Sequence, residues 1–345
     1  MRSTGTKTMV LLLLIAAAAC GGDEPLDTPT TRGGDPGQTL TVYSGREEEF
    51  VAPLFDAFTQ DTGVPVEIRY GDSAELAATI VEEDDASPAD VFFSQDAGSL
   101  GAVGEAGLLS TIDDAILERV EERFRSDDGS WVGTSGRGRV AVFNTDLVDP
   151  ADLPASIFDL ADPEWKGRLG LPPTNSSFQA HVAAMIVSEG EDATRAFLEG
   201  LIDNEVVSYE DNGATTRAVA AGEIEVGLVN HYYKYEVEAE DGALPLANHY
   251  FAAGDPGAFV NAAGVGILAS TAHPDEAARF VEYVTGEPGQ TFVAEDTWEY
   301  PVAPGYEPSV DILPLEDFQG PDVDLSSLGT ALPQALALLA EVGMV

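Results

Sequence analysis

The chain has 345 residues, of which 61 are Asp or Glu and 16 are Lys or Arg, so its formal net charge is −45 at neutral pH. Charge of this size and sign argues against binding to nucleic acid or to an anionic membrane surface, because both would repel the protein throughout its approach. It favours a saline habitat, where salt screens self-repulsion and carboxylates keep the surface hydrated. The alternative explanation of the acidic composition is that it attracts cations.

The N-terminus has the pattern of a secretory signal peptide. Arg2 and Lys7 precede the apolar run "MVLLLLIAAAA", and Cys20, the only cysteine, follows at once. We predict a signal peptide over residues 1–19, and Cys20 resembles the lipidated cysteine of bacterial lipoproteins. A plain signal peptide with a chance cysteine is the alternative. Cleavage would remove Arg2 and Lys7, which leaves 14 basic residues and a net charge of −47.

Residues 20–39 are rich in Gly, Pro, Asp and Thr and are predicted to be a flexible tether. Apolar residues then become frequent over about 300 residues, enough for two lobes. "LTVYSG" at 40–45 predicts a strand and 46–63 a helix. "VPVEIRYG", "SAELAATIVEED" and "ADVFFSQD" then predict a strand, a helix and a further strand. This alternation predicts a parallel sheet covered by helices, with ligands beyond the carboxyl ends of the strands.

The same alternation returns in the second half of the globular chain. Strands are predicted for "GRVAVFNTDLV" at 138–148, "GRLGLPP", "VVSYEDNG" and "IEVGLVNHYYKY", with helices over 176–190 and 214–222. A later strand at 257–268 precedes an amphipathic helix at 273–286. We expect one lobe from 40–140 plus 262–304 and a second from 141–261. Residues 305–345 should form helices packed on a lobe.

Tyr232 and Tyr233 are adjacent and follow the apolar run "IEVGLVN". Neighbouring residues on a strand point to opposite faces, so both phenols can serve one site only if the chain turns there. Read from these residues alone, the pair is better explained by aromatic packing than by ligand binding, because two aromatic residues at a strand end more often pack than bind a ligand.

Five segments together carry a family resemblance: "LTVYSGRE", "ADVFFSQDAGSLGAVGEAGLL", "WVGTSGRGRVAVFN", "WKGRLGLPPTNSSFQ" and "VGLVNHYYKYE". From about Leu40 to about Pro304 the chain resembles the ferric-iron-binding lipoproteins of bacterial ABC importers, in the type II, transferrin-like group of periplasmic binding proteins. The resemblance implies an α/β fold of two lobes, each a mainly parallel sheet flanked by helices, with the ligand cleft between them. It also implies an extracytoplasmic protein, anchored through lipid on Cys20, that delivers Fe(III) to an ABC permease. We expect a monomer and no enzyme activity.

Ferric iron prefers anionic oxygen donors, and phenolate is a strong one although free tyrosine has a pKa near 10. The resemblance places the iron ligands at Tyr232 and Tyr233. It also shows departures: Glu47 stands where many members have a histidine ligand, Gln95 where they have a glutamate, and Phe178 where others have a third tyrosine. An anion, water or Glu47 is left to complete the coordination shell.

Family members also hold a synergistic anion, such as carbonate, against the iron. Arginines and helix N-termini supply the positive charge and N–H donors that an anion needs. The predicted anion-binding or supporting residues are Arg46, Gln95, Arg137, Asn175, Ser176, Asn212 and Asn230. His231, which precedes the tyrosines, is expected to face solvent rather than to support them.

Two alternatives stay open. A polyamine or an oxyanion could bind the same fold, with Tyr209, Glu210, Asp211 and Tyr235 adding to a polyamine site. An enzyme on a two-lobed binding fold is disfavoured, because the only cysteine is used at the lipid anchor and the mature chain has no GxSxG motif.

Overall fold

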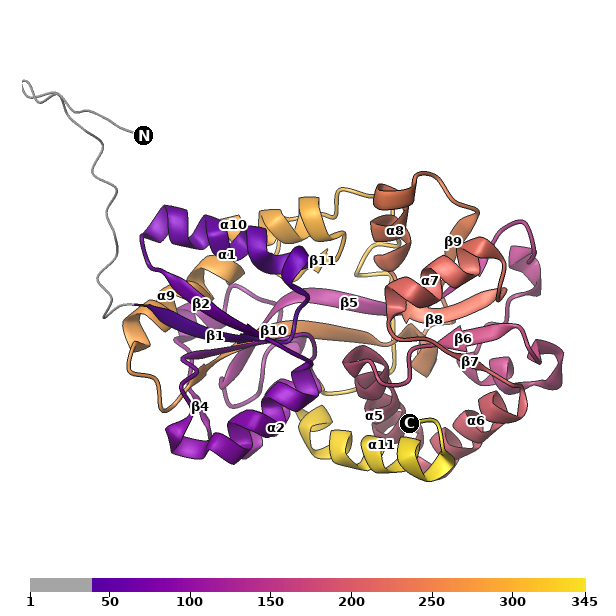
Figure 1. The fold of residues 1–345 in the computed structure, drawn as a ribbon, viewed down its shortest axis with the longest axis horizontal. Coiled ribbons are helices and arrows are strands. Elements are labelled where there is room, and N and C mark those ends of the chain that lie inside the picture. The colour runs from indigo at the N-terminus through magenta and orange to yellow at the C-terminus, as the bar shows by residue number, and fades with distance from the viewer. Residues whose placement is uncertain (1–38) are drawn as a thin grey trace, which may run out of the picture. The chain divides into compact units, whose positions relative to one another are not determined.

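The structure of the protein, a computed structural model, describes residues 39–345. The predicted signal peptide, Cys20 and all but the last residue of the predicted tether lie outside these residues. Strands and helices alternate in the first lobe as the sequence predicts (Figure 1). The elements are β1 (Leu40–Ser44), α1 (Glu48–Thr62), β2 (Val66–Tyr70), α2 (Ser73–Glu83), β3 (Val91–Ser94) and α3 (Ala97–Glu105). Strand β1 pairs in parallel with both β2 and β3.

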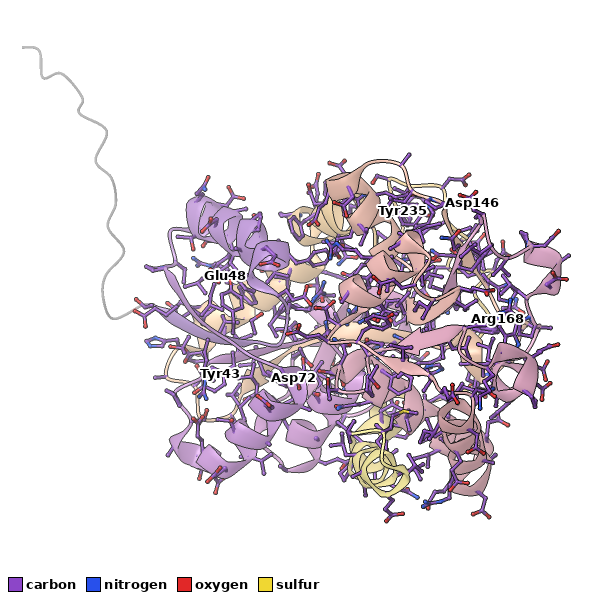
Figure 2. All side chains as sticks on the ribbon, turned by 45° about the vertical axis from the view of Figure 1, so that its right-hand side comes forward. Tyr43, Glu48, Asp72, Asp146, Arg168 and Tyr235 are labelled. Atoms are coloured by element: carbon purple, nitrogen blue, oxygen red, sulfur yellow. The ribbon has the colours of Figure 1, made fainter. Side chains whose placement is uncertain are left out.

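Local sequence explains where these elements begin and end. Helix α1 stops at Gly63, whose φ of 74° is the left-handed conformation that glycine adopts without steric cost. Asp72 caps α2 by accepting hydrogen bonds from the N–H groups of Ala74 and Glu75. Carboxylates such as Glu48 and Asp146 point into solvent (Figure 2). The acidic residues therefore serve both as helix caps and as surface charge.

Two long strands cross between the lobes. Strand β5 (Trp131–Asn144) runs antiparallel to β10 (Val260–Leu268) as far as Gly138, and from Arg139 it pairs with β8 (Val226–Asn230). It begins seven residues before the strand predicted at 138–148, because the glycines of "GTSGRG" resemble a loop. The absence of a side chain has a packing reason at Gly138, where an added Cβ would lie 2.5 Å from the ring of Phe318.

The second lobe is built on the far half of β5. Its strands are β6 (Leu169–Leu171), β7 (Val207–Ser208), β8 and β9 (Leu246–His249), and its helices are α5 (Ser176–Glu189), α6 (Glu191–Asp203), α7 (Asn212–Ala221) and α8 (Tyr233–Asp241). Strand β6 is parallel to β7 and β8, whereas β8 and β9 are antiparallel to β5. The whole sheet has the order β2-β1-β3-β10-β5-β8-β6-β7 and is mixed: parallel at its ends and antiparallel at the crossing strands. We propose that the lobes divide where β5 changes partner, close to the boundary predicted at 140/141.

The remaining elements complete the first lobe and join both lobes. They are β4 (Leu109–Ser110), α4 (Asp114–Leu117), α9 (Pro274–Thr285), α10 (Glu287–Phe292), β11 (Tyr300–Pro301) and α11 (Leu328–Val342). In 305–345 only the residues from Leu325 to Val342 are helical. Pro308, Pro314 and Pro321 lack the N–H that a helix needs, so the preceding segment is irregular. Helix α11 packs against α3 of the first lobe and α5 of the second. With the turn before it, it is long and apolar enough to cross a membrane by length and composition alone.

Candidate functional site

The tyrosine pair lies where the chain turns from a strand into a helix. Strand β8 ends at Asn230, Tyr232 already has helical backbone angles, and α8 begins at Tyr233. The turn sends both rings the same way, and they stack with centroids 4.5 Å apart. Each side chain is only 2% exposed. The two phenols therefore form one buried group, as a shared site requires.

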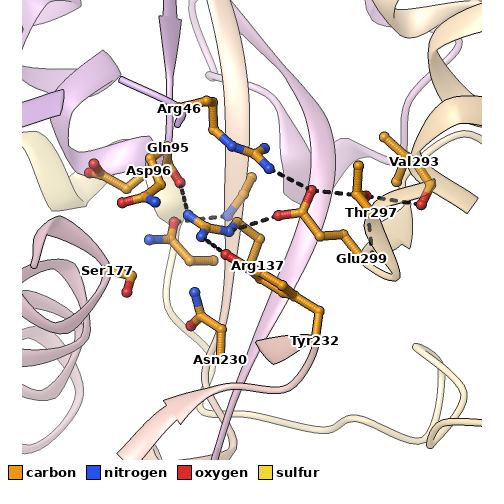
Figure 3. A network of polar contacts seen from close by, with 12 residues as sticks. Arg46, Gln95, Asp96, Arg137, Ser177, Asn230, Tyr232, Val293, Thr297 and Glu299 are labelled. Carbon is orange, nitrogen blue, oxygen red and sulfur yellow. Dashed lines mark hydrogen bonds and ion pairs between the residues drawn. The ribbon is translucent and has the colours of Figure 1, made fainter. Parts of the chain in front are cut away.

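Arg137, on the crossing strand β5, fixes the hydroxyl of Tyr232. Its Nη2 donates a hydrogen bond to the Tyr232 hydroxyl, and its Nη1 donates to the main-chain oxygen of Gln95 at 2.6 Å. Its Nε forms an ion pair with Glu299 at 3.0 Å (Figure 3). Gln95 thus contributes to the site through its main-chain oxygen. The structure brings three of the predicted residues into contact here, namely Gln95, Arg137 and Tyr232.

Arg46 and Arg137 share one buried carboxylate. Arg46 Nη2 lies 3.0 Å from the second oxygen of Glu299, and its guanidinium also lies 5.1 Å from the centre of the Phe50 ring. Burial alone would raise the pKa of Glu299, but Arg46 and Arg137 hold it below its ordinary value. The sequence analysis missed Glu299, which is more than 160 residues away from Arg137 and belongs to no recognisable motif.

Arg139 is the second residue that the sequence analysis missed, although its spacing from Arg137 places both on the same face of β5. Its Nη1 donates to Asn230 at 3.0 Å and lies within 3.5 Å of Ser177 and Asn212. Among residues 39–345 no carboxylate forms an ion pair with it. Burial and the charge of Arg137 lower the pKa of Arg139 to about 9. The Nε of Arg139 and the Nδ2 of Asn230 are buried and have no hydrogen-bond partner in the part of the chain that the structure describes.

Asn175 and Ser176 begin helix α5 beside this cluster. The side-chain oxygen of Asn175 accepts hydrogen bonds from the N–H of Ser177 and from Asn212, at 3.0 and 3.1 Å. Ser176 instead donates its hydroxyl to Asp72, the cap of α2 in the first lobe. Asn175 is therefore held in the polar cluster around Arg139, whereas Ser176 links the two lobes.

Glu47 lies at the solvent edge of the site. Its side chain is exposed and forms no hydrogen bond with the described residues, although surrounding protein raises its pKa against the attraction of Arg137 and Arg46. It lines a cavity of about 390 Å³ together with Phe50, Glu236 and Trp298. Burial and the charge of Glu47 raise the pKa of Glu236 to about 8. In residues 39–345 no three His, Cys, Asp or Glu side chains gather as metal ligands, so any metal here would rely on the phenols.

His231 does not face solvent as expected from the sequence, but is completely buried behind the tyrosines. The N–H of Gly138 donates to its Nδ1 at 3.2 Å, and its Nε2 lies 3.1 Å from the main-chain oxygen of Trp298. Its ring stacks on Tyr300 with centroids 4.4 Å apart. Burial lowers its pKa to about 4, which keeps the ring neutral. The wrong expectation arose because a polar residue after a strand is usually on the surface.

The environment keeps both phenols protonated in the absence of a cation. Burial raises the pKa of Tyr232, and the positive charge of Arg137 opposes this rise. For Tyr233, burial, Tyr232 and Glu47 all raise the pKa. A bound cation would have to displace both protons.

Asp96 supports the first-lobe side of the site at a cost in stability. It is completely buried and accepts hydrogen bonds from the N–H and hydroxyl of Ser99 at 2.8 and 2.9 Å. Burial raises its pKa to about 6, so its contribution to stability is full at low pH and is lost as the pH rises through that value. Asp96→Asn should raise the free energy of unfolding near pH 8 by about 2–3 kcal/mol and change it little near pH 4. Urea unfolding at both pH values measures this, and a destabilised variant at the higher pH would contradict it.

Comparison with known proteins agrees with the fold. Residues 86–316, more than half of the chain, match the family described as bacterial extracellular solute-binding protein. The "Fe(3+)-binding periplasmic protein" of Serratia marcescens is 36% identical over 310 residues, covering 89% of this chain and 91% of that one. The "Major ferric iron-binding protein" of Neisseria meningitidis serogroup B is 32% identical over 345 residues, covering 98% and 99%.

Solved structures extend the comparison to the fold. The crystal structure of iron-bound HitA from Pseudomonas aeruginosa superposes with a TM-score of 0.84 at 36% identity, over 88% of this chain and 99% of that one. The apo ferric ion-binding protein A of Pasteurella haemolytica gives a TM-score of 0.78 at 28% identity, over 88% and 98%. These relatives are named as binding proteins rather than enzymes, and they confirm the predicted two-lobed type II fold. The chain belongs to the family of bacterial extracellular solute-binding proteins.

Proposed function

We propose that this protein captures ferric iron outside the cytoplasm through the phenolate oxygens of Tyr232 and Tyr233 and delivers it to an ABC permease. The observation that carries the proposal is the stacked, buried tyrosine pair at the end of β8. A highly charged cation can displace phenolic protons that burial otherwise retains. The names of the relatives, which include ferric-iron-binding proteins, support the same ligand.

A synergistic anion such as carbonate completes the proposed site. The residues fit an anion, because among residues 39–345 Arg139 has no carboxylate partner and two buried donors, its own Nε and the Nδ2 of Asn230, have no acceptor. The starts of α5 and α7 add further polar groups through Asn175 and Asn212. We place the anion at Arg139 rather than at Arg46, since Arg46 is already paired with Glu299.

Capture requires the lobes to move, because both tyrosines are buried in this conformation. In the proposed mechanism, iron first reaches the phenols while the lobes are apart. Closure then brings Arg46, Glu47 and the backbone of Gln95 onto the site, and the hydrogen bond from Ser176 to Asp72 joins the lobes. The side-chain carboxylate of Glu47 has no hydrogen bond within residues 39–345, so it is free to become an additional iron ligand.

The other proposals concern the surroundings of the protein. Lipid on Cys20 would anchor it to the outer side of the cell membrane, the tether would let the lobes reach a permease, and the protein would act as a monomer. Its acidity supports a role without nucleic acid.

A polyamine fits the site less well than iron does. Ferric iron can displace the phenolic protons and gain two anionic ligands, whereas an organic ammonium group cannot. A polyamine would therefore meet the guanidinium groups of Arg46, Arg137 and Arg139 without that compensation. Tyr235, one of the residues expected in a polyamine site, instead donates its hydroxyl to the main-chain oxygen of Asp311. An oxyanion alone could accept hydrogen bonds from the phenols, but it would make no use of their ability to become anionic ligands.

A ligand panel tests this function. Purified protein should be stabilised against thermal unfolding by ferric citrate with carbonate, because a ligand that binds only the folded state raises its stability. Spermidine and inorganic phosphate, each without iron, are the matched alternatives and should give no comparable shift. Stabilisation by spermidine or by phosphate alone, with none from iron, would overturn the proposal.

A further inference from the structure

Glu299 is a completely buried carboxylate whose two oxygens are used by two different arginines. One oxygen lies 3.0 Å from Nε of Arg137 and the other 3.0 Å from Nη2 of Arg46. The Thr297 hydroxyl lies 3.3 Å from the second oxygen and 3.0 Å from the main-chain oxygen of Val293, so the two oxygens share its one proton. A buried charge is stable only when it is paired in this way, so Glu299 and the two arginines form one unit (Figure 3).

An unusual stretch of backbone brings Glu299 to this position. Helix α10 continues into a π-helical turn, Val293–Thr297, and Trp298 then has a φ of 53°, in the left-handed region that bulky residues rarely adopt. The main-chain oxygen of Trp298 lies 3.1 Å from Nε2 of the buried His231, and β11 follows at Tyr300 and pairs with β5. These contacts thus hold the strained backbone at Trp298, and this backbone conformation directs the next side chain, Glu299, towards the two arginines.

The geometry of Arg137 shows what this placement achieves. Its guanidinium is held on three sides, by the oxygen of Gln95, by Glu299 and by the hydroxyl of Tyr232. Gln95 and Glu299 are fixed parts of the first lobe, whereas Tyr232 belongs to the turn after β8. We propose that Glu299 is a positioning residue for ferric-iron binding. It orients Arg137 so that Nη2 donates to the Tyr232 oxygen, and its ion pair with Arg46 prevents Arg46 from competing with Arg139 for the anion.

This inference rests on the proposed function. It also gives the negative charge of Glu299 a role in determining where the anion binds. Without Glu299, three buried guanidinium groups would lie near the tyrosines with no carboxylate paired to them among residues 39–345. Arg46 and Arg137 would then be free to bind anions themselves. Glu299 therefore leaves Arg139 as the one of these three arginines without a carboxylate partner among residues 39–345, which limits where the anion binds.

The test compares Glu299→Gln with Glu282→Gln, a control that removes an exposed ion pair with Arg119. In Glu299→Gln the side chain loses the negative charge that holds both guanidinium groups, and its N–H₂ group would face one of them, so Arg46 and Arg137 would both be held less firmly. A hydrogen bond to a phenolate lowers the energy of its donor electrons. Its loss should move the visible ferric-phenolate band of Glu299→Gln to longer wavelength. Iron should also dissociate about 10–100-fold faster, as when the supporting partner of a metal ligand is lost.

The carbonate requirement gives a further readout that a merely structural role would not change. In Glu299→Gln the freed arginines should lower the carbonate concentration needed for half-maximal band intensity, whereas Glu282→Gln should match the wild type in every measurement. If the wild type shows the band, and Glu299→Gln has the same band position, iron dissociation rate and carbonate requirement, the proposed role of Glu299 is overturned. Absence of the band in the wild type would instead overturn the proposed function.

Thr297→Val keeps the experiment decisive if Glu299→Gln does not fold. This variant removes the hydroxyl that Glu299 shares with the main-chain oxygen of Val293, while it preserves side-chain volume and the ion pairs of Glu299. Circular dichroism establishes that it is folded. A smaller band shift in the same direction is expected, and an unchanged band together with an unchanged dissociation rate would overturn the proposal.

Discussion

Tyr232→Phe and Tyr233→Phe are each expected to lower ferric-iron affinity by at least about 100-fold, which is the upper end of the effect of losing a partner outside the ligand shell. Each change removes one anionic oxygen while the aromatic ring and its packing remain. The stacking of the two rings, 4.5 Å apart, should survive, so the loss would report on ligation rather than on folding. Competition with a chelator of known ferric affinity measures the change.

Tyr235→Phe is the matched control for this prediction. Tyr235 lies on the same helix, but its hydroxyl donates to Asp311 and does not reach the pair. The control should keep wild-type affinity and lose only the stability of one hydrogen bond, about 1 kcal/mol. Equal losses of iron affinity in all three variants would mean that the hydroxyls matter for folding rather than for ligation. Unchanged affinity in Tyr232→Phe or in Tyr233→Phe would show that the substituted tyrosine is not an iron ligand.

Lowering the pH is the second change that should strongly reduce the affinity for ferric iron. Burial raises the pKa of both tyrosines, so both carry a proton at neutral pH and must release it when iron binds. Acid therefore competes with iron. Displacement of two protons predicts that affinity falls by about 100-fold for each unit by which the pH is lowered. Iron binding measured against the same chelator over about pH 6 to 8, with the chelator's own protonation corrected, gives the slope.

The single tyrosine variants provide the control for the pH dependence. Tyr232→Phe leaves one phenolic proton to be displaced, so its affinity should fall only about 10-fold for each pH unit. The same slope in the wild type and in this variant would show that the protons come from other groups. A flat profile in the wild type would show that iron binds without phenolate ligands.

The alternation of strands and helices in the first lobe could be predicted from the sequence, because each of those elements has its own periodicity and a clear stop such as Gly63. The first half of β5 could not. Its glycines are typical of a loop, and only neighbours distant in sequence, such as Phe318 against Gly138, explain why they stand in a buried strand. The antiparallel pairing of β5 and β10 is likewise set by long-range contacts that no local pattern records.

For the site, the sequence predicted the residues that stand next to strand ends. Tyr232, Tyr233 and Arg46 follow strand ends and come together as expected from a sheet whose loops meet at one edge, whereas Arg137 reaches them from within β5. Glu299 was missed because its link to Arg137 depends on a strained turn far along the chain. Arg139 could have been found, since residues two apart on a strand share a face.

The central claim is that two tyrosinate oxygens bind ferric iron, and a visible absorption spectrum tests it most directly. The spectrum would be recorded on purified protein after addition of ferric citrate and carbonate, beside the Tyr232→Phe, Tyr233→Phe double variant. We predict a broad visible band in the wild type that is absent from the double variant, since only ferric phenolate among the ligands considered absorbs there. No band in the wild type, or an equal band in both proteins, would contradict the claim.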